Sequence, residues 1–130
     1  MRLLRILAAA RALAASTAFS QTANVNDGKW EVTIPYPSKP VVADLDLAGE
    51  GGMFRSHAGG KTNTCGGRET PVSVVLSTAD ELKFTIHYSK VLEGCKDMTF
   101  DVKRADDSSF KGTWPDKRFG PLEAVVKRKH

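Results

Sequence analysis

The sequence predicts an all-β domain, built as an antiparallel β-sandwich of about seven to eight short strands with one disulfide. A small eight-stranded meander barrel is the alternative architecture. Two observations support this fold class. Apolar and polar residues alternate with a period of two over many short segments, and turn-forming residues separate those segments. After the first 20 residues, no segment has the apolar stripe of an amphipathic helix.

The segment 82–88 shows the alternation most clearly, because apolar or aromatic residues occupy one face and polar residues the other. The segment 72–76 is almost continuously apolar, so we expect it to be a central strand. The expected strands are 29–34, 41–48, 53–57, 72–76, 82–88, 98–103, 110–114 and 122–127.

Proline and glycine mark several strand ends. Pro35, Pro37 and Pro40 stop the first strand, because proline cannot donate a ladder hydrogen bond. The Gly-Glu-Gly-Gly run at 49–52 predicts a hairpin turn. No internal repeat is present, and residues 28–130 are expected to form a single β-domain.

The first 20 residues are typical of a secretory signal peptide. A basic start precedes a stretch rich in Ala and Leu, and Ala18-Phe19-Ser20 offers a small-residue cleavage pattern. Arg11 interrupts the apolar stretch and leaves two alternatives, an amphipathic N-terminal helix or a start codon placed too early. We expect removal of 1–20, a flexible segment at 21–27, and a periplasmic or secreted location.

The net charge of the chain is +4, and it falls to +1 when Arg2, Arg5 and Arg11 leave with the signal. A nearly neutral domain lacks the dense basic face on which non-specific nucleic-acid binding depends, so no nucleic-acid partner is expected. No later segment approaches the run of about 20 apolar residues that a membrane helix needs. The mature protein is therefore expected to be soluble, without an integral membrane segment.

Cys65 and Cys95 are the two cysteines of the chain. In an exported protein they are expected to form a disulfide, and no C-x-x-C pair of the redox-active kind is present. On the chain-entropy model, a loop of this size contributes about 3.5 kcal/mol of stability. The disulfide is expected to have a structural role.

Three groups of residues could bind a ligand. In the loop 65–71, Arg68 could hold an anionic group beside paired glycines, although Arg68 and Glu69 could equally pair with neighbouring strands. His57 and His87 are chemically capable, but they lack local metal-ligand spacing, so solvated histidines are favoured and no metal site is expected.

Aromatic residues form the third group. Tyr36, Trp114 and Phe119 are predicted near loops or strand ends, where carbohydrate-binding domains stack sugar rings. The alternative is that Trp114 belongs to the core, because a small β-domain needs large residues to fill it. The candidate ligand-binding residues are Arg68, Glu69, Trp114, Tyr36, His57 and His87.

An enzyme is not expected. The sequence has no G-x-S-x-G motif and no free cysteine once the two are paired, and its paired acids Asp106 and Asp107 lie in a turn. We therefore expect no catalytic residues and no cofactor.

Two resemblances add to this interpretation. Gly28-Lys29-Trp30 on the first strand resembles the G-x-W that opens lipocalin and avidin-like barrels, and it covers three residues. A longer pattern resembles small exported disulfide proteins of Gram-negative proteobacteria, for which no activity is known. It comprises Leu45-x-Leu47-x-Gly49-x-x-Gly52, Cys65-Gly-Gly-Arg68-Glu69, Pro71-Val72 and Lys90-Val-Leu-Glu-Gly-Cys95-Lys-Asp97.

The function expected from these observations is that of a non-catalytic binding or interaction protein of the cell envelope. Its partner would be an envelope macromolecule or a small ligand. The alternative is a carrier of small ligands or carbohydrates with a barrel-type cavity, for which an open interior would be the mark. An envelope enzyme or enzyme inhibitor is the third hypothesis.

Overall fold

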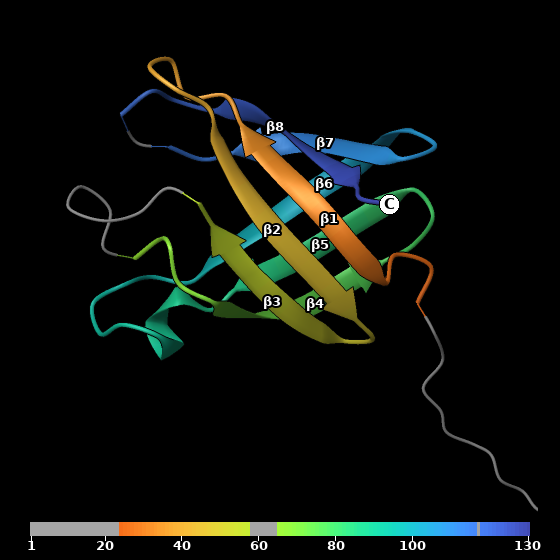
Figure 1. The fold of residues 1–130 in the computed structure, drawn as a ribbon, viewed down its shortest axis with the longest axis horizontal. Coiled ribbons are helices and arrows are strands. Elements are labelled where there is room, and N and C mark those ends of the chain that lie inside the picture. Colours follow the sequence, from red (N-terminus) through yellow and green to blue (C-terminus); the bar gives the residue numbers. More distant parts are fainter. Residues whose placement is uncertain (1–23, 58–64, 117) are drawn as a thin grey trace, which may run out of the picture.

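The structure, a computed structural model, describes residues 24–57, 65–116 and 118–130. The predicted signal peptide at 1–20 lies outside the described residues. Eight strands and one short 3-10 helix follow one another along the chain (Figure 1). They are β1 (Gly28–Ile34), β2 (Val41–Ala48), β3 (Gly51–Ser56), β4 (Thr70–Ser77), β5 (Glu81–Ile86), η1 (Tyr88–Lys90), β6 (Met98–Asp106), β7 (Ser109–Trp114) and β8 (Leu122–Arg128).

The strands form a closed antiparallel barrel in which each strand pairs with the next along the chain. Closure is provided by β1 and β8, whose register places Val32 opposite Val126 and Trp30 opposite Arg128. The all-β class, the strand number and the disulfide are confirmed. The sandwich is corrected to the alternative barrel, because pairing of the first and last strands leaves one continuous sheet without edges.

The interior of the barrel is filled with side chains. Alternate residues of each strand point inward, as their period of two requires. The rings of Phe84 and Phe100 meet edge to face with their centroids 5.6 Å apart, and the ring centroids of Trp30 and Phe110 are 5.4 Å apart. The largest fully buried side chains are Trp30, Phe54, Phe84, Phe100, Phe110, Ile34, Leu45, Leu82, Ile86, Val32, Val102 and Val126. A ligand cannot occupy the centre without displacing this core.

The two ends of the barrel differ in the length of their connections (Figure 1). At the hairpin end, on the right of Figure 1, the strands are joined by the short turns 49–50, 78–80 and 107–108. At the loop end, on the left, lie the described residues of the longer connections, namely 35–40, 65–69, 87–97, 115–116 and 118–121. Binding residues gather on loops held by a rigid scaffold, which directs attention to the loop end.

Residues of the N-terminal segment cover the hairpin end. The Arg128 guanidinium lies 4.2 Å from the centre of the Trp30 ring and donates a 2.9 Å hydrogen bond to the Asp27 carbonyl. Asn26 is buried and donates to the Ser77 hydroxyl and the Thr78 carbonyl. Residues 24–27 are the described part of the segment 21–27, which the sequence predicts to be flexible, and they make these hydrogen bonds to the barrel.

β4 is not the central, doubly buried strand that its apolar sequence suggested. A closed barrel has one interior and one solvent face, so every second residue of β4 points outward. Val75 and Leu76 are 59% and 40% exposed, and the pairing register with β5 shifts between Val74 and Leu76. The continuous apolar run therefore supplies an exposed strip as well as a core face.

The disulfide joins two of the long connections at the loop end. Cys65 follows β3 and Cys95 precedes β6, and their Cα atoms lie 5.9 Å apart. It therefore links the described residues 65–69, which lead into β4, to the segment 87–97. Within the described part of the chain, no helix is long and apolar enough to cross a membrane.

Replacing both cysteines, as Cys65→Ser with Cys95→Ser, should lower the free energy of unfolding by about 3.5 kcal/mol, because the unfolded chain regains loop entropy. Urea unfolding followed by tryptophan fluorescence measures this difference. The oxidised protein treated with a reducing agent should match the double variant. An unchanged denaturation midpoint in both samples would contradict a stabilising role.

Candidate ligand-binding cleft

A cleft of about 850 Å³ opens at the loop end of the barrel. Its walls come from the end of β1, the start of β2, the end of β3 and the segments 35–40 and 115–121. This volume falls within the range of about 300–1,000 Å³ typical of small-molecule sites. We call it the loop-end cleft, and the lining residues used below are Tyr36, Lys39, Phe54, Tyr88, Trp114, Asp116, Arg118 and Phe119.

Aromatic rings form the floor of the loop-end cleft. Phe54 stacks on Trp114 at a centroid distance of 6.3 Å, and Tyr88 meets Phe54 edge to face at 6.5 Å. Phe100 in the core contacts Trp114 at 5.3 Å. Trp114 is therefore both the top of the core and the bottom of the cleft, and it is only 8% exposed.

A chain of hydrogen bonds joins Trp114 at the end of β7 to Tyr36 and Asp116. The Trp114 indole N–H donates to the Tyr36 hydroxyl at 3.0 Å, and that hydroxyl in turn bonds to the Asp116 carboxylate. Burial, together with the Asp116 carboxylate, raises the pKa of Tyr36. The Phe119 and Arg118 backbone N–H groups donate to Asp116 and lower its pKa, so this carboxylate is ionised and already hydrogen-bonded.

Tyr88, Trp114 and Asp116 line both the loop-end cleft and a second hollow of about 550 Å³. The hollow has a largely apolar wall that includes Cys65, Met98 and Pro121. Burial raises the pKa of the Tyr88 phenol to about 12. Among the described residues, no side chain or backbone group is hydrogen-bonded to its hydroxyl. Tyr88 therefore presents a neutral phenol that a ligand could engage.

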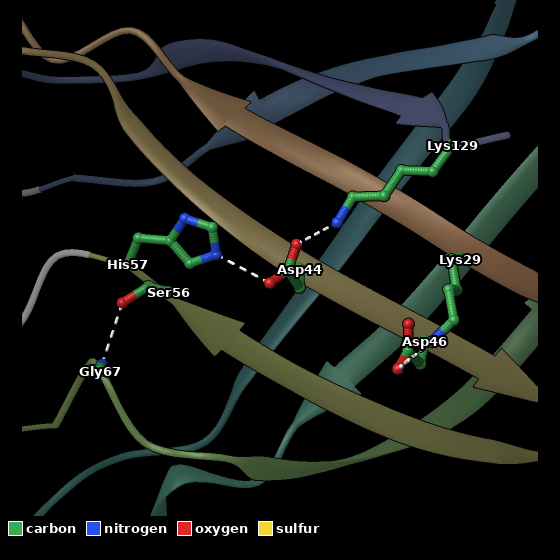
Figure 2. A network of polar contacts seen from close by, with 7 residues as sticks. All are labelled: Lys29, Asp44, Asp46, Ser56, His57, Gly67 and Lys129. Atoms are coloured by element: carbon green, nitrogen blue, oxygen red, sulfur yellow. Dashed lines mark hydrogen bonds and ion pairs between the residues drawn. The ribbon is translucent and has the colours of Figure 1, made fainter.

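His57 lies at the margin of the cleft and belongs to a network on the outer face of β1, β2 and β3 (Figure 2). Its Nε2 lies 2.7 Å from Asp44, which also accepts a hydrogen bond from Lys129 (Figure 2). These two bonds, that of Lys129 first, lower the pKa of Asp44. Beside them, Lys29 pairs with Asp46 at 3.3 Å. Pairs this exposed contribute little stability each.

His87 lies on the side of the barrel within a second cluster. Its Nε2 is 2.7 Å from the Ser73 hydroxyl and its Nδ1 is 3.2 Å from Asp97. The Ser89 hydroxyl and backbone N–H both donate to Asp97 and lower its pKa to about 2. Because Asp97 is ionised, the tautomer with a proton on Nδ1 fits best, and Nε2 then accepts from Ser73.

The sequence-predicted residues therefore divide between separate places. Tyr36, Trp114 and His57 meet at the loop-end cleft, whereas His87 belongs to the Ser73–Asp97 cluster. Arg68 and Glu69 are exposed and line neither hollow. The neighbouring Gly67 N–H already donates to the Ser56 hydroxyl at 3.0 Å (Figure 2). It is therefore not free to join Arg68 in binding an anion.

The histidines do not approach each other, because β4 lies between the strands that precede them. Within residues 24–57, 65–116 and 118–130, no group of three His, Cys, Asp or Glu side chains could hold a metal ion.

Sequence reasoning missed Phe54 and Tyr88 as cleft residues, and Ser73 and Asp97 as partners of His87. The sequence predicts Tyr88 on the inward face of a strand 82–88, which is the signal that it offers, but β5 ends at Ile86 and Tyr88 begins η1. The pairing of Ser73 with His87 depends on strand register, which places residue 73 opposite 85 and so brings 87 nearby.

No protein-family model matches the sequence, and no curated protein matches it. Among solved structures, the chain is similar to a redesigned β-barrel, with a TM-score of 0.52 and 14% sequence identity. The alignment covers 80% of this chain and 91% of the redesigned barrel. At this level of identity the similarity concerns the fold alone.

A carboxyl-carbon NMR titration should give Asp97 a pKa of about 2, against an ordinary value of 3.8. Because the folded-state pKa is depressed, the stability from Asp97 is present above pH 3.8 and lost as the pH falls toward 2. Ser89→Ala removes one donor and should raise this pKa. Ser108→Ala, which removes a hydroxyl donor of Asp106 instead, should not. An unchanged Asp97 titration in Ser89→Ala would contradict this assignment.

Proposed function

We propose that this protein is an exported, non-catalytic binding protein of the cell envelope, and that it holds a small, partly apolar molecule in the loop-end cleft. The observation that carries the proposal is the aromatic floor formed by Phe54, Tyr88 and Trp114 at the end where the long connections gather. Small-molecule sites are commonly concave and apolar, with a few polar groups that fix orientation. Tyr36 and Tyr88 supply such groups.

The location of the proposed site differs from that of a carrier with an open barrel interior. Phe84, Phe100 and Phe110 fill the centre, so the ligand would lie above Trp114 rather than below it. A ligand in the centre would have to displace those rings. Each displaced ring would lose about 1.5–3 kcal/mol of burial free energy, which a ligand bound at the end of the barrel does not lose. The exported location is supported by the Cys65–Cys95 disulfide, which persists in oxidising compartments.

Sugar stacking on Trp114 receives little support from the geometry. Phe54 stacks on this indole, Phe100 meets it edge to face, and it is largely buried. A sugar ring would need an open aromatic face. Phe119 is the more accessible ring, at 45% exposed.

The Ser73–His87–Asp97 cluster has the hydrogen-bond order of a hydrolytic triad, yet its setting favours a structural role. Ser73 lies within β4, between ladders that pair it with Gly51 on β3 and Thr85 on β5. Acyl transfer needs free donors beside the nucleophile to stabilise the oxyanion, and ladder pairing uses the backbone N–H groups there. We interpret the cluster as a clasp that fixes the loop 87–97 against β4.

Ligand binding can be tested by NMR on the labelled, oxidised protein, titrated in turn with fatty acids, glycans, nucleotides and divalent metals. An apolar ligand should shift the Trp114 indole signal together with Tyr36 and Tyr88. Phe119→Ala should weaken binding several-fold, because about 0.5–1.5 kcal/mol of ring contact is lost. Val75→Ala removes another exposed apolar side chain, on the barrel wall, and should have no effect. Shifts confined to Arg68, or none with any class, would refute the proposed site.

We expect the Ser73–His87–Asp97 cluster to have no acyl-transfer activity. Wild type and Ser73→Ala should release p-nitrophenol from p-nitrophenyl acetate at the same rate, and a fluorophosphonate probe should leave Ser73 unmodified by mass spectrometry. A covalent adduct on Ser73, or hydrolysis lost in Ser73→Ala, would instead identify an enzyme.

A further inference from the structure

We propose that the loop-end cleft selects anionic amphiphiles, molecules with an apolar chain or ring system and a single carboxylate or similar acidic group. This inference rests on the proposed function and adds the chemical class of its ligand. The apolar part would lie against Phe54, Tyr88 and Trp114, with the acidic group at the rim beside Lys39 and Arg118.

The rim of the loop-end cleft carries two cationic side chains. Lys39 and Arg118 come from the separate segments 35–40 and 115–121, and both line the cleft with exposed side chains. No described carboxylate forms a salt bridge with either of them. By contrast, Lys29, Lys103 and Lys129 on the outer face all pair with acidic side chains. The rim cations are thus available to an incoming anion.

The carboxylate in the loop-end cleft, that of Asp116, is already hydrogen-bonded within the protein. Asp116 accepts the backbone N–H groups of Arg118 and Phe119, at 2.8 and 3.0 Å, and the Tyr36 hydroxyl. These donors position the carboxylate as part of the loop and spread its charge. A ligand cation would have to compete with them, whereas a ligand anion meets Lys39 and Arg118, neither of which forms a salt bridge with a described carboxylate, although the charge of Arg118 acts on Asp116.

The Arg118 side chain packs against an aromatic ring. Its guanidinium lies 5.1 Å from the centre of the Phe119 ring, and that ring meets Tyr36 edge to face at 5.9 Å. A guanidinium stacked on an aromatic ring is restrained in orientation but keeps its N–H donors at its edge. Those donors can engage a carboxylate with two parallel hydrogen bonds. The aromatic floor and the cationic rim are therefore built into one connected structure.

The test compares three probes with the same ten-carbon chain, namely decanoate, decanol and decyltrimethylammonium. Dissociation constants come from titrations that follow the Trp114 indole signal at low ionic strength. Decanoate should bind at least about threefold more tightly than decanol, because two exposed ion pairs contribute modestly, and the ammonium should bind most weakly. Raising the salt to about 0.5 M should reduce the preference for decanoate, because exposed pairs are screened.

The double variant Lys39→Ala with Arg118→Ala should bind decanoate and decanol equally. Its control is Lys111→Ala with Lys127→Ala, which removes the same charge from exposed positions on β7 and β8 and should keep the preference. Equal binding of decanoate and decanol to the wild type, or a preference that survives in the rim variant, overturns the anionic class while the cleft remains a binding site. If no probe shifts Trp114, both proposals fail.

Discussion

The pairing of β1 with β8 is the contact on which the rest of the structure depends. Trp30 and Val32 of β1 face Arg128 and Val126 of β8, and this ladder turns an eight-strand meander into a closed barrel. Closure removes both edge strands and encloses one core. The barrel has two rims, and these differ because short turns join the strands at one and longer connections join them at the other.

That asymmetry sets the location of the candidate site. At the hairpin end, Arg128, Asn26 and the short turns close the barrel. At the loop end, longer connections leave space above Trp114, and the disulfide and the His87–Asp97 clasp hold two of those connections. The scaffold thus has a sealed end and a concave end. The concave end combines buried aromatic rings with Lys39 and Arg118, which form no salt bridge with a described carboxylate, and the proposed amphiphilic ligand rests on this combination.

Some features of the site follow from local sequence, and others do not. Tyr36, Trp114 and Phe119 were identified because aromatic residues stand next to proline-rich or glycine-rich loops. Their hydrogen-bond partners, and the contribution of Phe54 from β3, were not, because they depend on which strand ends share a rim. The unusual loop 65–71 favours Arg68 as a ligand-binding residue, but Arg68 is exposed and does not line the loop-end cleft. His57 and His87 looked equivalent in sequence and differ entirely in their surroundings.

The all-β class, the number of strands and the cysteine pair could be predicted from the sequence, because period-two alternation, turn residues and two cysteines are local or countable properties. The sequence did not decide between a sandwich and a barrel, since both bury the same alternate residues. Only the tertiary structure settled that choice, through the β1–β8 register. The same register decided which side chains meet at the loop end. Contacts between residues far apart in the chain follow from closure, which no single segment encodes.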